Sequence, residues 1–271
     1  MSNRTIVWFS CGAASAVAAK QSIERWPERE VVVVCCDTRP SEHPDNYRFS
    51  QDVEKWLGAQ VVAGPSHAAA APRIITYIKS AKFTTVEEVF EKTRYMAGVG
   101  GARCTTELKK IPRLEFAAPD DRHVFGFTFD EQKRVREFTK RNPELLLDWP
   151  LIDSRTTKKD CYRIISEAGI ELPAMYLLGF DNNNCPGCVK ASSPWYWAMV
   201  RKHFPEVFAM RCKQSRELGV RLVEIHHHER IFLDELPDRE FKKFRKKENL
   251  SCGPECGGQI AMNFGQSKQT K

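Results

Sequence analysis

An apolar run near the start of the chain breaks into small residues that could bind an anion. Residues 7–9 lead into a loop at 10–15 and then into a helix-like segment that reaches residue 23. A strand that passes directly into a helix presents backbone N–H groups at the positive end of the helix dipole, so phosphate is the expected anion. The loop has one glycine and lacks the Lys-Ser/Thr ending of a Walker A loop, so an ordinary tight turn is the competing interpretation. Its residues are Ser10, Cys11, Gly12, Ala13, Ala14 and Ser15.

Paired cysteines are the second feature that could support chemistry. Of the ten cysteines, Cys185 and Cys188 stand in a C-x-x-C turn that points two thiolates at one centre. Cys252 and Cys256 form a second pair, and Cys104 is a fifth candidate for four positions. Four thiolates predict a site for a zinc ion or an iron–sulfur cluster. Four of the remaining five are expected to pack as small buried hydrophobes, and the loop cysteine stays open: Cys35, Cys36, Cys161, Cys212 and Cys11.

Composition narrows the class of protein. The chain has 271 residues, of which 42% are hydrophobic, so it can form one large domain or a domain with an appended subdomain. It begins without a charged-then-apolar leader, and no apolar run approaches about 18 residues, so we expect a cytoplasmic protein with no membrane segment. In a reducing compartment, clustered cysteines bind metal or do redox chemistry more often than they form disulfides. The net charge of +7 favours nucleotide or nucleic-acid partners.

The apolar pattern predicts the elements that position these residues. It predicts strands at 4–9, 31–36 and 60–63, separated by helices at 13–25 and 44–57. This alternation is typical of an α/β fold with a doubly wound, mainly parallel sheet. Ligands of such sheets bind beyond the carboxyl ends of the strands, where the 10–15 loop and Asp37 both fall.

The rest of the chain has a less regular pattern. Residues 86–116 look helical and are interrupted by glycines at 98, 100 and 101, which predict a mobile loop over the site. Further elements are predicted as a strand at 123–128, helices at 130–140, 157–168 and 194–218, and a strand at 221–225. We divide the chain into a nucleotide-binding α/β domain at 1–170 and a cysteine-rich C-terminal subdomain at 171–271 packed on it.

Several motifs, taken in order, resemble the PP-loop adenine-nucleotide enzymes of the phosphoadenylyl-sulfate (PAPS) reductase family, which includes ATP pyrophosphatase subunits of DNA phosphorothioation systems. Residues 10–15 resemble the loop Ser-Gly-Gly-x-Asp-Ser, and Asp37-Thr38 resembles the Asp-Thr after the second strand. Residues 104–112 resemble Cys-Cys-x-x-x-Lys-x-x-Pro, and Gly126 with residues 131–134 occupies the place of Gly-x-Arg-x-x-Glu/Asp. Residues 179–188 resemble Gly-x-x-x-C-x-x-C, and 255–257 resemble a terminal Glu-Cys-Gly. The resemblance implies an adenine nucleotide alpha hydrolase-like fold, with Asp37, Thr38, Gly126 and the 10–15 loop binding the nucleotide.

The chain departs from the family pattern at chemically important positions. Cys11 and Ala14 stand where the loop has a Gly and the Asp. Thr105 replaces the second of the tandem cysteines, which leaves Cys104 and the 185–188 pair as family-type ligands. Either Cys252 or Cys256 would then be the fourth ligand. The His that usually follows the terminal Glu-Cys-Gly is absent.

The resemblance implies two alternative reactions. An ATP pyrophosphatase would hold ATP with magnesium at the loop, adenylate a substrate oxygen for later sulfur insertion and release pyrophosphate, with Lys109 and Arg134 among its cations. A reductase would use Cys256 to attack the sulfur of a sulfonucleotide, and sulfite would be released. The first reaction is preferred, because the terminal His is absent and the basic, aromatic-interleaved segment 239–247 suits a nucleic-acid backbone.

The same resemblance implies cofactors and partners. The expected cofactors are ATP with magnesium and a 4Fe-4S cluster, with zinc as the alternative. Candidate partners are nucleic acid, a cysteine desulfurase or thioredoxin-like protein, and a second copy of the chain in a homodimer. The non-enzymatic alternative is a zinc-stabilised nucleic-acid-binding module, although the cysteines lack a compact finger spacing.

Overall fold

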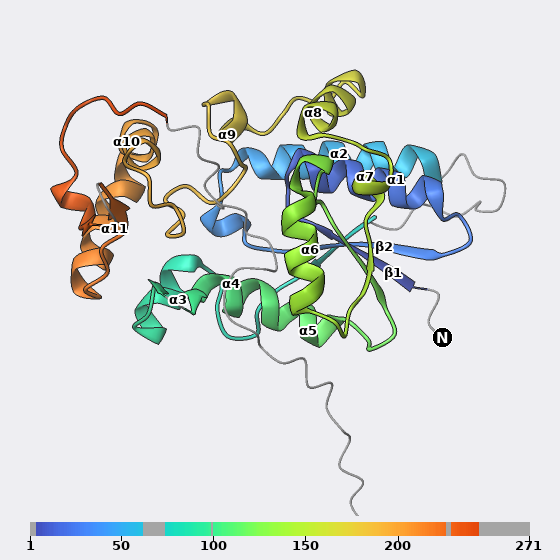
Figure 1. Cartoon of the computed structure of the whole chain (residues 1–271), viewed down its shortest axis with the longest axis horizontal. Coiled ribbons are helices and arrows are strands. Elements are labelled where there is room, and N and C mark those ends of the chain that lie inside the picture. Colours follow the sequence, from blue (N-terminus) through green and yellow to red (C-terminus); the bar gives the residue numbers. More distant parts are fainter. Residues whose placement is uncertain (1–3, 62–73, 99, 226–228, 244–271) are drawn as a thin grey trace, which may run out of the picture.

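The core of the fold is a five-stranded parallel sheet (Figure 1). The computed structural model describes residues 4–61, 74–98, 100–225 and 229–243. The strands lie in the order β3-β2-β1-β6-β7, and every neighbouring pair is parallel. Their bounds are Arg4–Phe9 for β1, Glu30–Cys36 for β2, Ile75–Ile78 for β3, Arg122–Phe125 for β6 and Leu146–Asp148 for β7. This arrangement confirms the predicted α/β class with a Rossmann-like, doubly wound sheet.

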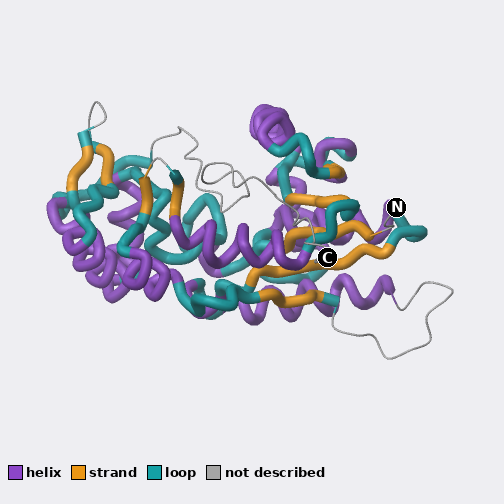
Figure 2. Tube along the Cα trace, turned by 90° about the horizontal axis from the view of Figure 1, so that it is seen from below, coloured by secondary structure: helices purple, strands orange, loops and turns teal. Residues whose placement is uncertain are grey.

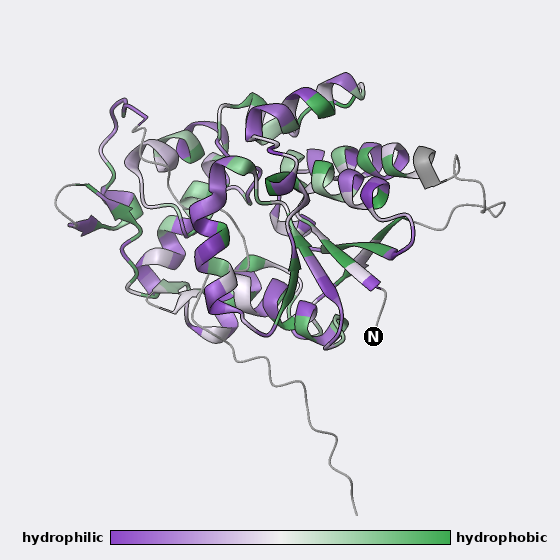
Figure 3. Cartoon of the chain, turned by 45° about the vertical axis from the view of Figure 1, so that its right-hand side comes forward, coloured by the Kyte–Doolittle hydropathy of each residue, from purple (hydrophilic) through white to green (hydrophobic). Residues whose placement is uncertain are grey.

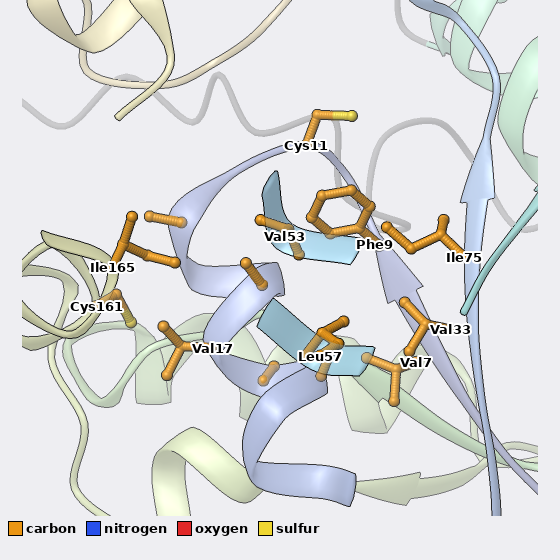
Figure 4. Packing of buried hydrophobic residues seen from close by; sticks show 14 of the residues in the cluster. Val7, Phe9, Cys11, Val17, Val33, Val53, Leu57, Ile75, Cys161 and Ile165 are labelled. Atoms are coloured by element: carbon orange, nitrogen blue, oxygen red, sulfur yellow. The ribbon is translucent and has the colours of Figure 1, made fainter. Parts of the chain in front are cut away.

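Alternate residues of the central strands pack against helices on the first face of the sheet. Val7 and Val33 lie in a hydrophobic cluster that also contains Val17, Leu57 and Ile165 (Figure 4). The helices that supply this layer are α1 (Ala13–Arg25), α2 (Asp45–Val61), α7 (Pro150–Asp153) and α8 (Lys158–Glu167). Because both faces of the sheet are covered, the strands have hydrophobic residues on each side, which are green in Figure 3.

The intervening strand residues face the second layer. Ile6, Trp8 and Val34 pack with Val135 and Phe138 of helix α6 (Gln132–Arg141). Helix α5 (Ile111–Phe116) adds the partly buried Phe116 to this cluster. The two-residue alternation along β1 therefore places successive side chains on opposite faces.

A second hydrophobic body lies at one end of the molecule, away from the sheet (Figure 2). Trp197 and Val200 of α10 (Pro194–His203) are fully buried in it, and α11 (Pro205–Glu217) packs alongside. Its other elements are α3 (Val86–Thr93), β4 (Ala97–Gly98), β5 (Gly101–Ala102), α4 (Arg103–Thr105), α9 (Ala174–Leu177), β8 (Val223–Glu224), β9 (Arg230–Ile231) and the 3-10 turn Leu233–Glu235. This cluster draws on residues 86–108 as well as 175–236, so it includes chain from both sides of the proposed 170/171 boundary. That boundary, and the separate C-terminal subdomain, stay predictions.

Several predicted elements differ from the structure for local reasons. The strand predicted at 60–63 is wrong at Gln60 and Val61, which extend α2; residues 62 and 63 lie outside the described part. The third strand is instead β3, where β-branched residues recur. The single helix predicted at 194–218 is two helices, because Pro205 cannot continue the hydrogen bonding of α10.

The segment around glycines 98 and 101 contains a short antiparallel pair, and the mobility expected of this loop stays a prediction. Gly98 and Gly101 face each other in the antiparallel pair β4–β5, so the glycines permit a tight reversal. Gly101 has a φ of 84°, which a glycine adopts without a Cβ penalty. Within the described ranges, no helix has the length and apolar character needed to span a membrane.

Candidate functional site

The strand order reverses between β1 and β6, and the two loops that leave these strands meet at one edge of the sheet. In doubly wound sheets, the crevice at such a reversal is where ligands bind. The β1–α1 turn (residues 10–15) leaves β1 here, and Gly126 directly follows β6. The sequence prediction that both segments belong to one site is therefore consistent with the topology.

The β1–α1 turn is stabilised by one serine side chain. Ser15 Oγ donates to the carbonyl oxygen of Gly12 at 2.9 Å and accepts from the backbone N–H of Ser10 at 3.1 Å. The N-cap residue of α1 is Gly12, which makes no side-chain capping hydrogen bond. The N-cap residue itself therefore does not satisfy the backbone N–H groups at the start of this 13-residue helix, and such a helix N-terminus is a common place for an anion to bind.

Cys11 occupies an unusual backbone conformation in this turn. Its φ is 54°, in the left-handed region that favours glycine. The side chain is 1% exposed and points into the hydrophobic cluster near Phe9 (Figure 4). The hydrogen bond with Cys35 and burial both raise the pKa of the Cys11 thiol well above its usual value. Cys11 is therefore a protonated, packed thiol, which does not act as a nucleophile at neutral pH.

Gly126 allows the end of β6 to approach the start of α1. A Cβ on Gly126 would lie 2.7 Å from the backbone nitrogen of Ser15 and 2.8 Å from its Cα. No side chain fits in that space, so a residue larger than glycine would push the helix N-terminus away. The predicted role of Gly126 in the site thus has a steric basis.

Two residues from the C-terminal half hold the same turn. The Tyr176 hydroxyl is hydrogen-bonded to the backbone of Ala13 and of Asn183, and burial raises the pKa of that hydroxyl to about 12. Asn183 donates through Nδ2 to the carbonyl oxygen of Cys11 at 2.6 Å and to Asn46 Oδ1 at 2.8 Å. Asn183 is buried, and its Oδ1 has no hydrogen-bond partner among the described residues. The sequence analysis missed both residues, although Asn183 belongs to the polar run just before Cys185.

Asp37 is engaged in ion pairs at the end of β2. Arg39 contacts it with two hydrogen bonds, Nε to Oδ1 at 2.8 Å and Nη2 to Oδ2 at 3.0 Å, and Lys79 Nζ lies 3.6 Å from Oδ2. Burial alone would raise the pKa of Asp37, but the hydrogen bonds and charge of Arg39 lower it overall. The guanidinium is held between the rings of Tyr47 and Tyr77, at 4.6 and 4.1 Å from their centroids. In this structure the carboxylate therefore faces cations of the chain itself.

A second, buried ion pair lies next to Asp37. Lys109 is the fourth residue of a π-helical segment, Thr106–Lys110, and π-helical turns often occur at functional sites. Its side chain is buried, and Nζ lies 3.9 Å from Glu42 Oε1. Glu42 also accepts hydrogen bonds from Thr38 Oγ1 at 2.6 Å and Asn46 Nδ2 at 2.8 Å. The predicted residues Thr38 and Lys109 thus meet through Glu42, which the sequence analysis did not select.

Arg134 lies on the side of the site formed by β6. It is ion-paired with Glu131, and its guanidinium lies 5.0 Å from the centroid of the Phe127 ring. Glu131 Oε2 also accepts from the backbone N–H of Thr128 at 3.1 Å, which fixes the loop after β6. The structure therefore places this predicted cation on the first turn of α6, tied to the loop that begins at Gly126.

Arg113 is a further cation that the sequence analysis did not select. It lies over the rings of Trp8 and Phe125, at 5.3 and 5.8 Å from their centroids, on the face of the sheet opposite α1. Its Nε and Nη1 atoms are buried and have no hydrogen-bond partner among the described residues. It also contacts the thiol of Cys36 at the end of β2. A motif search would not find it, because its position follows from the fold.

The turn that contains Cys185 and Cys188 is held by hydrogen bonds to the Tyr196 side chain. The backbone N–H of Cys188 donates to the Tyr196 hydroxyl at 2.8 Å, and that hydroxyl donates to the carbonyl oxygen of Cys185 at 3.4 Å. Both cysteines lie in the second hydrophobic cluster, and Cys104 packs against it. In the part of the chain that is described, no group of three or more His, Cys, Asp or Glu side chains is placed to hold a metal ion. The predicted ligands Cys252 and Cys256 lie outside the described residues.

The geometry defines a doubly wound, Rossmann-like α/β protein with a helix N-terminus, buried cations and a polar network at the switch point of the sheet. In comparisons with known proteins, no family model matches the chain, and no curated protein sequence matches it.

Proposed function

We propose that the protein is an ATP pyrophosphatase that adenylates a substrate oxygen for sulfur insertion, with nucleic acid as the acceptor. The observation that carries this proposal is the position of the β1–α1 turn, which joins the N-terminus of α1 to the strand-order reversal of a parallel sheet. Nucleotide phosphates bind at this position in doubly wound folds. The choice of adenine and of ATP comes from the motif resemblance.

The cations around the turn support chemistry at phosphate. Attack at the α-phosphorus transfers negative charge to the leaving pyrophosphate, and preorganised cations in a buried site stabilise that charge. Lys109 is buried and contacts the loop after β2 through Glu42, and Arg134 contacts the loop after β6 through Glu131, so the two belong to segments on either side of β1. Their carboxylate partners, Glu42 and Glu131, hold them in place. Asp37 fits a magnesium ligand poorly here, because Arg39 and Lys79 already neutralise it.

The CxxC turn (residues 185–188) fits two ligands of a thiolate-held group. Its backbone is fixed by Tyr196, which keeps the two cysteines on one rigid turn. A bound iron–sulfur cluster would supply sulfur or electrons, and a zinc ion would supply structural support. The other thiolates would come from Cys104 and one of the two cysteines near the C-terminus.

The proposal is tested by offering the anaerobically purified protein ATP and, separately, two sulfonucleotides. Incubation with ATP and magnesium is expected to release pyrophosphate and AMP, whereas adenylyl sulfate and phosphoadenylyl sulfate are expected to give no sulfite. Sulfite release without pyrophosphate formation would reject the ATP pyrophosphatase and support the reductase. Neither product, together with no nucleotide binding by calorimetry, would support the non-enzymatic alternative.

Lys109 provides the sharper variant for this assay. Lys109→Met keeps the aliphatic stem and removes the charge, so we expect pyrophosphate release to fall by about 10²–10³-fold. Lys140→Met is the matched control, because Lys140 is exposed at the end of α6. Equal activity of the two variants would remove Lys109 from the mechanism.

A further inference from the structure

Arg211 is a buried cation that connects the CxxC turn to helix α3. Its side chain is 1% exposed. Nε donates to the carbonyl oxygen of Gly187 at 3.2 Å, and Nη2 donates to Glu87 Oε1 at 2.6 Å. Nη1 donates to Gln214 Oε1 at 2.6 Å, which fixes the plane of the guanidinium. One planar group therefore contacts both the cysteine turn and the first turn of α3.

Glu87 extends this connection to the loop after β2. Ser41 Oγ donates to Glu87 Oε2 at 2.8 Å and accepts from the backbone N–H of Val86 at 2.8 Å. The backbone N–H of Ser41 donates to the carbonyl oxygen of Thr38 at 3.0 Å. An unbroken series of hydrogen bonds thus runs from Gly187, through Arg211, to Thr38 at the sheet edge.

Tight packing at the cysteine end of the series leaves little room for independent movement. Gly187 has a φ of 69°, and a Cβ there would lie 2.8 Å from Val207 Cγ1 and 3.3 Å from Arg211 Cγ. The Phe90 ring lies under the guanidinium, at 5.2 Å from its centroid. A shift of Arg211 therefore has to displace the CxxC turn, because the turn rests directly on its side chain.

We propose that Arg211 is a positioning residue that couples the thiols of Cys185 and Cys188 to nucleotide binding at the sheet edge. The inference rests on the proposed nucleotide site and adds a second function to it, a signal between that site and the CxxC turn. Nucleotide at the edge orders the loop that contains Thr38 and Ser41, and the Glu87–Arg211 pair transmits this order to Gly187. Such coupling is reciprocal, so the state of the thiols changes nucleotide affinity by the same factor.

The coupling is measured by the alkylation rate of Cys185 and Cys188 in the full chain, purified anaerobically and treated with a chelator so that neither thiol is held by a metal. Rates with N-ethylmaleimide are followed by peptide mass spectrometry, with and without ATP and magnesium. We expect nucleotide to slow alkylation by at least about fivefold in the wild-type protein. Ser41→Ala and Glu87→Leu each break the series and are expected to abolish this protection.

Conservative and distant variants separate coupling from general damage. Glu87→Gln keeps an oxygen for Arg211 and an N–H for Ser41 Oγ, so it is expected to restore the protection that Glu87→Leu loses. Ser80→Ala alters a half-buried serine outside the series, and Arg216→Met alters an exposed residue on the same helix as Arg211; both are expected to behave as wild type.

Nucleotide affinity, measured by calorimetry in every variant, separates two failures. If ATP binds and Ser41→Ala shows the wild-type protection, the coupling is overturned and the proposed function stands. If ATP does not bind the wild-type protein, the proposed function fails. The series of hydrogen bonds from Gly187 to Thr38 is then tested by comparing alkylation rates of variants without nucleotide. In that case, Ser41→Ala is expected to speed alkylation of Cys188 when it is introduced into the wild-type protein. When it is introduced into the Arg211→Met variant, it is expected to leave the rate unchanged. If Arg211→Met does not fold, Glu87→Leu takes its place as the second background. An equal acceleration in both backgrounds overturns the inference.

Discussion

Because the backbone of Cys11 is left-handed, the strain caused by its Cβ can be measured separately from the packing of its sulfur. Cys11→Gly and Cys11→Ala both remove the buried sulfur, but only the alanine keeps a Cβ at a φ of 54°. We expect the glycine variant to be more stable than the alanine variant by about 1 kcal/mol, because a non-glycine residue is strained in this region. Urea unfolding of the two variants measures the difference. An alanine variant that is the more stable one would mean that the turn relaxes out of this conformation.

A buried histidine gives the protein a defined response to acid. His123 is buried between strands and accepts a hydrogen bond from Trp8 Nε1 through Nδ1 at 3.1 Å. Burial lowers its pKa to about 4; Asp121 opposes this shift, and Arg113 and Arg4 add to it. Since the unfolded chain binds a proton near pH 6.5, the stabilisation is present above that pH and is lost as the pH falls toward about 4.

The corresponding prediction uses His123→Gln, which keeps an acceptor for Trp8 and does not titrate. Between pH 7 and 4, the wild-type protein should lose about 3 kcal/mol more of its free energy of unfolding than the variant. Asp37, Asp121 and Asp148 also have lowered pKa values, but they are present in both proteins and their contributions cancel in the comparison. Parallel pH profiles from denaturant unfolding would contradict the assignment.

At the scale of elements, the site depends on how closely the end of β6 approaches α1. Gly126→Ala places a methyl group 2.7 Å from a backbone nitrogen, so α1 must shift. We expect a loss of about 1–3 kcal/mol of stability, with weaker nucleotide binding. The matched control is Gly58→Ala in α2, where the new Cβ meets only the flexible end of Ile74, at 2.8 Å from Cδ1.

The control variant is expected to change stability by less than about 1 kcal/mol, because alanine favours the helix and Ile74 can move. Thermal unfolding and calorimetric titration with ATP follow both variants. Unchanged nucleotide affinity in Gly126→Ala, in a protein that remains folded, would separate the turn from ligand binding.

The sequence predicts the sheet edge better than it predicts the contacts within it. Strand–helix alternation and the small residues of the 10–15 loop were sufficient to place β1, β2 and α1, since hydrophobic periodicity is a local property. Arg113 and Asn183 were missed because only long-range packing brings them to the edge of the sheet. They lie 102 and 172 residues after Cys11 in the sequence, and Asn183 nevertheless donates a hydrogen bond directly to the carbonyl oxygen of Cys11. Asp37 was selected correctly as an edge residue, yet its pairing with Arg39 depends on side-chain geometry that no motif records.

At the scale of the whole molecule, the two hydrophobic bodies have different proposed roles. The sheet and its helices position the turn, whereas the second cluster buries the CxxC turn beside α10 and α11. The two bodies are joined by side chains such as Asn183, which donates to the carbonyl oxygen of Cys11, and Ser41, which donates to Glu87 of α3. Loss of a thiolate-held group should therefore affect the second body first.

Removal of metal tests this division. Treating the anaerobically purified protein with a chelator should increase amide hydrogen exchange across residues 185–217 and leave the strands β1 and β2 protected, because metal binding is coupled to local folding. Cys185→Ser should reproduce the pattern without chelator. Cys161→Ser is the control, since Cys161 is fully buried in the sheet cluster, and it should loosen α1 and α8 instead. Exchange that rises uniformly over both bodies would show one cooperative unit, and exchange that does not respond to the chelator would remove the metal from the CxxC turn.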